Sequence, residues 1–240
     1  MTHFTNWGDP DSPSRALIIH GLSSSGASWW RVAEALASEG WFVTAPDLRG
    51  HGTSPRAATY SFEDFVSDLP PGSFDLVIGH SLGGAISVVA GSRHGYTGGL
   101  VLLDPVLEVP EDQWEQIKAD QLAELELSAE TIAASKPHWS ERDVALKLEA
   151  VAHVDRDAIA RAFDDNPGWN LVQQTTELRV STLILGGDHA VHSMLAKETA
   201  EAICAANPHV TYRVIAGAGH SPHRDRPDDT LAEILAFAHS

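Results

Sequence analysis

The stretch VIGHSLGG, residues 77–84, decides how the whole chain is interpreted. It contains the pattern Gly-x-Ser-x-Gly around Ser81, with an apolar run before it (residues 74–78) and a run typical of a helix after it (residues 85–94). A strand, a tight turn and a helix in this order place a serine on a strained turn with its hydroxyl exposed at the end of a sheet. We therefore predict that Ser81 is a catalytic nucleophile.

Composition and charge bound the partners that the chain takes. Its 240 residues, 43% apolar and 20% charged, suit one globular domain with or without an inserted lid. A net charge of −17 repels phosphate backbones and anionic lipids, so we expect neither nucleic acid nor membrane as a partner. Cys204 is the single cysteine, and residues 1–13 lack the apolar core of a signal peptide. These features favour a cytoplasmic protein.

Short apolar runs alternate with runs of helical periodicity along most of the chain, which predicts an α/β fold. The expected strands are residues 4–7 at an edge, then 15–20, 41–45, 74–78, 99–103, 182–185 and 210–215. The expected helices are residues 28–40, 61–69, 85–94, 193–205 and 228–239. This order predicts a mostly parallel sheet with helices on both faces.

Residues 106–178 interrupt this alternation, because strand-like runs stop there. Helices are expected at residues 111–125, 128–135, 141–150 and 155–164. We expect residues 1–105 and 179–240 to form the core, and residues 106–178 to form a helical lid inserted between two strands. Ligands bind beyond the carboxyl ends of strands in such sheets, so the lid would cover the site.

A serine nucleophile needs a base and an acid that orients the base. We assign His220 as the base, since it follows a predicted strand through a glycine-rich turn, residues 217–219. Asp188 and Asp104 both end predicted strands and both lie between the serine and the histidine in sequence. We favour Asp188, because its strand directly precedes the strand of the base, and keep Asp104 as the alternative acid.

Two backbone amides are expected to form an oxyanion hole, which stabilises the charge that develops in the transition state. One is the amide of Leu82, the residue after the nucleophile. The other is the amide of Leu22 in the turn after the first central strand, with Ser23 as the second choice.

Several segments together resemble the α/β-hydrolase superfamily: HG (residues 20–21), PDLRGHGTS (46–54), GHSLGG (79–84), LDP (103–105) and GAGHSPH (217–223). The resemblance is strongest to small bacterial carboxylesterases and lactonases and does not extend to the lid. It implies a triad of Ser81, His220 and Asp188 with the amides of Leu22 and Leu82. Epoxide hydrolases and haloalkane dehalogenases of this fold have an aspartate nucleophile, so Ser81 excludes both. Residues 46–54 are expected to be scaffold.

Five tryptophans are candidates for the substrate pocket. Two follow the oxyanion turn and three lie in the lid: Trp29, Trp30, Trp114, Trp139 and Trp169. Their aromatic surface favours an apolar or aromatic substrate over a highly charged one.

The sequence therefore predicts a serine hydrolase that cleaves a small-molecule ester or lactone through an acyl-enzyme intermediate. No cofactor is required, and Asp188, His189 and His192 are not expected to bind a metal. The same triad also suits hydrolysis of a carbon–carbon bond, an amide or a carbamate, and perhydrolysis, because fold does not fix function. A ligand-binding member without catalysis is the alternative from a different class.

Overall fold

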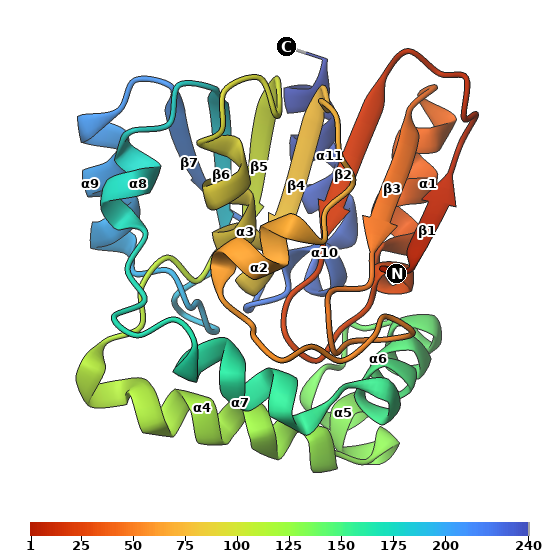
Figure 1. Ribbon diagram of the computed structural model, residues 1–240, viewed down its shortest axis with the longest axis vertical. Coiled ribbons are helices and arrows are strands. Elements are labelled where there is room, and N and C mark those ends of the chain that lie inside the picture. The colour runs from red at the N-terminus through yellow and green to blue at the C-terminus, as the bar shows by residue number, and fades with distance from the viewer. Residues whose placement is uncertain (240) are drawn as a thin grey trace.

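A seven-stranded sheet forms the centre of the protein in the computed structural model, which describes residues 1–239 (Figure 1). Its strands are β1 (Phe4–Trp7), β2 (Arg15–Ile19), β3 (Phe42–Pro46), β4 (Leu76–His80), β5 (Gly99–Leu103), β6 (Ser181–Gly186) and β7 (Val210–Val214). Their spatial order is β1-β3-β2-β4-β5-β6-β7. β1 pairs antiparallel with β3 at one edge, and the other strands run parallel. The predicted mostly parallel sheet is confirmed.

Helices cover both faces of the sheet, as the unbroken apolar runs of its strands require. α1 (Trp30–Ser38), α10 (Pro222–Asp225) and α11 (Pro227–Ala238) lie on one face, and α2 (Phe62–Ser67), α3 (Leu82–Gly91), α8 (Val172–Thr176) and α9 (Lys197–Ala206) on the other (Figure 1). Successive β2 side chains alternate between the two faces. Leu17 and Ile19 therefore pack in the core beneath α2 and α3, whereas Ala16 and Ile18 pack in the core beneath α1 and α11.

The helix after Ser81 begins earlier than expected. α3 starts at Leu82, directly after Ser81, rather than at residue 85, and all ten of its residues are buried. A short 3-10 turn, η1 (Gly26–Trp29), likewise precedes α1 within the predicted helix 28–40. The α3 start matters for the site, because the unpaired amides of a helix N-terminus then face the serine.

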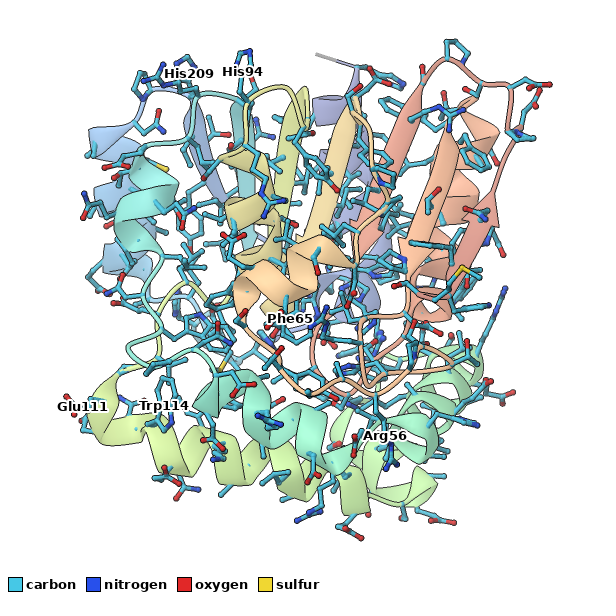
Figure 2. The ribbon with its side chains drawn as sticks, in the orientation of Figure 1. Arg56, Phe65, His94, Glu111, Trp114 and His209 are labelled. Atoms are coloured by element: carbon cyan, nitrogen blue, oxygen red, sulfur yellow. The ribbon has the colours of Figure 1, made fainter. Side chains whose placement is uncertain are left out.

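Four helices lie across the carboxyl ends of the strands (Figure 1). We call them the lid helices: α4 (Trp114–Ala123), α5 (Ala129–Ser135), α6 (Glu141–His153) and α7 (Arg156–Asp164), with the short turns η2 (Glu111–Gln113) and η3 (Glu124–Glu126). Figure 2 shows Arg56 and Trp114 near the lid helices, and His94 and His209 at the opposite end of the sheet. All four helices were expected from the sequence.

The segment before β6 does not belong to the lid helices alone. α8 was not predicted, and it packs beside α9 and α3 on a face of the sheet. The division of the chain into a core and a lid of residues 106–178 therefore stays a prediction. Within residues 1–239, every helix falls short of the length and apolar character needed to span a membrane.

Candidate active site

Ser81 occupies a strained turn between β4 and α3. Its φ of 55° and ψ of −119° lie in a region that non-glycine residues rarely adopt, and such a conformation costs about 1–3 kcal/mol. The turn closes tightly, because a Cβ on Gly79 would overlap the carbonyl group of Gly83. This conformation aims the hydroxyl away from the sheet, into a cavity under the lid helices.

His220 bridges Ser81 and a carboxylate. Its Nε2 lies 3.0 Å from the Ser81 Oγ, and its Nδ1 lies 2.6 Å from Oδ2 of Asp104. The backbone of His220 is held as well, because His80 Nε2 donates to the His220 carbonyl oxygen at 2.7 Å. Burial lowers the pKa of His80 well below its usual value, so His80 is a neutral donor. A serine, a histidine and a carboxylate thus form one hydrogen-bonded chain.

The structure does not bring Asp188 to His220, which corrects the favoured assignment of the acid. The Asp188 carboxylate accepts hydrogen bonds from the backbone amides of Ala190 at 2.9 Å and Gly217 at 2.8 Å, and so closes the turn before the histidine. The reason lies in the order of the strands. His220 reaches from the end of β7 across β6 to Ser81 beyond the end of β4, and its ring therefore meets the end of β5, where Asp104 lies.

Asp104 is completely buried, and four donors surround its carboxylate. Besides His220, these are Ser193 Oγ at 2.5 Å, the Met194 amide at 2.9 Å and the Gly187 amide at 3.1 Å. Although burial raises the pKa of Asp104, the hydrogen bonds from His220, Ser193 and Met194 lower it to about 2. Asp104 therefore carries a negative charge beside the histidine throughout the neutral range.

The predicted oxyanion turn lies against the nucleophile. A Cβ on Gly21 would come within 2.9 Å of the Ser81 Cβ, so only glycine allows this approach. His20 fixes the turn: its Nδ1 donates to the Gly21 carbonyl oxygen at 2.7 Å, and its Nε2 accepts from the Leu48 amide at 3.0 Å. Burial lowers the pKa of His20, in keeping with this neutral tautomer. Leu48 belongs to the segment 46–54 that was expected to be scaffold.

Leu22 and Leu82 both border a narrow extension of the cavity beside Ser81. Leu82 is the first residue of α3, so its amide has no acceptor within the helix and the helix dipole favours an anion there. The structure thus places Leu22 and Leu82, the two residues predicted to supply the amide donors, beside Ser81.

The cavity over Ser81 has a volume of about 220 Å³, and its walls come from the core and from the lid helices. Trp139 borders it, and Trp169 borders the extension. The other three tryptophans border neither space. Trp29 is buried against His223, the Trp30 indole donates to Asp143, and Trp114 packs edge-on against Phe163. Two of the five pocket candidates are therefore at the site.

Charged side chains that were not expected from the sequence also border the cavity. Lys147 of α6 is buried and donates to Ser23 Oγ at 2.6 Å, the Ser23 carbonyl oxygen at 3.2 Å and Glu124 Oε2 at 2.9 Å. A lid helix thus holds the residue that follows Leu22. Lys136 and Arg224 complete the cationic part of the wall. In the sequence, Lys147 falls within the expected helix 141–150, and Lys136 and Arg224 fall outside the expected helices.

Asp188, His189 and His192 do not form a metal site in this structure. Over residues 1–239, no three histidine, cysteine, aspartate or glutamate side chains are grouped so that they could hold a metal ion.

The sequence of this chain is similar to those of known proteins. Residues 16–234 match the model of the "Alpha/beta hydrolase family". "Lipase LipV" of Mycobacterium tuberculosis is 36% identical over 128 residues, which cover 50% of this chain and 48% of that protein. "Esterase YbfF" of Escherichia coli is 25% identical over 93% of this chain and 92% of that protein.

Solved structures share the fold over the whole chain. The crystal structure of "E-2-(Acetamidomethylene)succinate Hydrolase" has a TM-score of 0.84 at 20% identity, and the match covers 100% of this chain and 95% of that one. The chain spans about half the length of the first curated relatives that it matches.

Proposed function

Because the chain belongs to the alpha/beta hydrolase family, we propose that it is a serine hydrolase that cleaves a carboxylic ester or a lactone. The observation that carries this proposal is the hydrogen-bonded chain from Ser81 through His220 to Asp104. Lipase and esterase relatives support the same class of reaction. Asp104 takes the role that the sequence had assigned to Asp188.

In the proposed first half-reaction, the Ser81 Oγ attacks the carbonyl carbon while His220 Nε2 takes the hydroxyl proton. Asp104 accepts the hydrogen bond from Nδ1, which keeps Nε2 free to act as the base and stabilises the imidazolium that forms. The electron pair of the carbonyl moves onto its oxygen. The amides of Leu22 and Leu82 donate to this oxyanion, and each such donor contributes about 2.7–4 kcal/mol to catalysis.

Collapse of the tetrahedral intermediate releases the alcohol, or opens the ring of a lactone, with His220 donating its proton to the leaving oxygen. Water then attacks the acyl-enzyme on Ser81, and His220 accepts a proton from it. The second collapse frees the carboxylic acid and returns the proton to Ser81. Every atom in this cycle comes from the substrate, water and the three side chains, so no cofactor is needed.

The cavity limits the size of the group next to the scissile bond. Its volume of about 220 Å³ is below the range of ~300–1,000 Å³ that is typical for drug-sized ligands. We therefore propose a small substrate, with the lid helices covering it during turnover.

A panel of substrates tests the function. p-Nitrophenyl acetate and butyrate, a γ- and a δ-lactone, an anilide, a carbamate and a vinylogous diketone would be compared in the wild-type protein and in Ser81→Ala. We expect the wild-type protein to hydrolyse the esters or the lactones, and Ser81→Ala to have lost this activity. Preferred cleavage of the diketone or the anilide would overturn the bond assignment. Absence of turnover and of any reaction with an activated ester would favour a ligand-binding protein.

A further inference from the structure

Arg224 is a buried cation without an ionic partner in the wall of the catalytic cavity. It belongs to α10, four residues after His220, and only 6% of its surface is exposed. Its Nη2 donates to Ser24 Oγ at 3.2 Å, and its Nε is buried with no hydrogen-bond partner. No carboxylate of residues 1–239 lies within ion-pair distance of it. A guanidinium carries five N–H donors, and burying its charge unpaired is costly.

The nearby carboxylates are already engaged by other donors. Asp225 accepts from the Trp139 indole at 2.7 Å and from the Gly219 amide at 2.8 Å. Asp143 accepts from the Trp30 indole, from Arg31 and from Ser140. Glu124 accepts from Lys147. Arg224 therefore has no ionic partner, although acidic side chains are close, because those side chains accept hydrogen bonds from other donors.

Arg224 and Lys136 both lie close to the ring of Trp139. The Arg224 guanidinium carbon is 4.6 Å from the centre of the Trp139 ring, and Lys136 Nζ is 5.9 Å from it. Lys136 also borders the cavity, and no ion pair to it occurs in the part of the chain that the structure describes. Trp139 thus lies near two cations that both lack a counter-ion.

The cavity wall is positive in a protein that is strongly negative overall. Lys136, Lys147 and Arg224 border the cavity with Glu124 as the one carboxylate, and Asp104 lies behind His220. The chain as a whole carries a net charge of −17. A positive, partly enclosed cavity concentrates field lines and selects anions over neutral molecules. The cavity wall is therefore more charged than the apolar pocket that the tryptophans predicted.

We propose that Arg224, assisted by Lys136, binds a carboxylate of the substrate, so that the natural substrate is an ester or lactone bearing a free carboxylate. A guanidinium presents paired N–H groups that match the two oxygens of a carboxylate. The small cavity places this carboxylate a few bonds from the scissile carbonyl, as in a half-ester of a short dicarboxylic acid. This inference rests on the proposed ester or lactone hydrolysis at Ser81.

Two substrates that share one acyl chain and differ in charge test the subsite. p-Nitrophenyl hydrogen adipate is an anion, and methyl p-nitrophenyl adipate is its neutral counterpart. We expect the wild-type protein to prefer the anion at least tenfold in kcat/KM. Arg224→Gln should lower this preference at least tenfold, mainly through KM, and Arg224→Lys should restore part of it. Lys136→Gln should lower it by a smaller factor.

Arg226→Gln is the matched control. Arg226 is an exposed arginine two residues along the chain that pairs with Asp229, so its loss changes the net charge equally without touching the cavity. It should keep the anion preference. An equal loss of preference in Arg226→Gln and Arg224→Gln would overturn the inference, because general charge would then explain it.

Binding to the Ser81→Ala variant gives a readout that does not depend on turnover. Isothermal titration with adipate and with dimethyl adipate should show at least tenfold tighter binding of adipate, lost when Arg224→Gln is added. Equal binding of the two, or failure of both to bind, would overturn the subsite. If neutral esters are hydrolysed at Ser81 without anion preference, the subsite fails and the proposed function stands. If adipate binds through Arg224 but no ester or lactone reacts, the proposed function fails alone.

Discussion

Replacing Asp104 by asparagine removes the charge beside His220 while keeping the shape of the side chain. In the wild-type protein, Oδ1 accepts from Gly187 and Ser193, and Oδ2 accepts from Met194 and His220. An asparagine that keeps its oxygen at the first position places its NH₂ group against the Met194 amide and His220 Nδ1. The histidine must then carry its proton on Nε2, where it faces Ser81 and cannot accept a proton.

The size of the effect follows from this change of tautomer. In the trypsin-type triad the same exchange lowers kcat about 10⁴-fold, or about 5 kcal/mol of activation free energy. We expect a loss of ~10³–10⁴-fold in kcat/KM here, because the Asp104 carboxylate likewise accepts from Nδ1 of the histidine. Stability should fall as well. The pKa of Asp104, lowered from 3.8 to about 2, corresponds to about 2 kcal/mol of unfolding free energy.

The assay compares Asp104→Asn with Asp188→Asn in the hydrolysis of p-nitrophenyl butyrate. An asparagine at 188 still offers an oxygen to the Gly217 or the Ala190 amide, so we expect less than a tenfold loss in kcat/KM. Circular dichroism and thermal unfolding establish that both variants are folded at the assay temperature. A larger loss in Asp188→Asn than in Asp104→Asn would refute the assignment of the acid.

Three further predictions concern Asp104, Gly21 and Lys147. The wild-type protein should have a larger unfolding free energy than Asp104→Asn, and this difference should be constant near neutral pH, shrink below pH ~4 and vanish near pH ~2. The reason is that a carboxyl whose pKa is lowered in the folded state stabilises the fold only while it is ionised. Urea unfolding from pH 7 to pH 3 measures the difference, and a constant difference would contradict the prediction. Gly21→Ala should lower kcat ~10–100-fold, because its Cβ meets Ser81 and displaces the oxyanion turn; unchanged steady-state kinetics would contradict this placement. Lys147→Met should lower the unfolding free energy by about 1–3 kcal/mol, because the Ser23 carbonyl oxygen and the Glu124 carboxylate lose a donor; urea unfolding measures this, with the exposed Lys197→Met as the control.

The fold and the strained turn at Ser81 could be predicted because their signals are local. The turn at Ser81 needs glycines at fixed offsets, and the strands of a covered parallel sheet are continuous apolar runs. The lid helices were predicted for the same reason, since each has its own periodicity or cap. Ser140 and Ser128, for example, both cap lid helices with their side chains.

The choice of carboxylate beside His220 and the charge of the cavity wall could not be predicted, because they depend on the spatial order of the strands and helices. Asp104 and Asp188 are equivalent in sequence, and only the position of β5 between β4 and β6 places Asp104 under His220. Lys147 and Arg224 are buried by elements distant in sequence, at Ser23 and Ser24. No local pattern marks a cation that will be enclosed in this way, so the charge of the wall emerges only from the assembled structure.

Covalent labelling tests the proposed nucleophilic role of Ser81 most directly. The wild-type protein would be treated with a fluorophosphonate, digested and analysed by mass spectrometry, alongside Asp104→Asn and Ser81→Ala. We expect one adduct on the peptide that contains Ser81, slower labelling of Asp104→Asn and no labelling of Ser81→Ala. An adduct on Ser23, Ser24 or Ser221 instead, or a native protein that stays unlabelled, would contradict it.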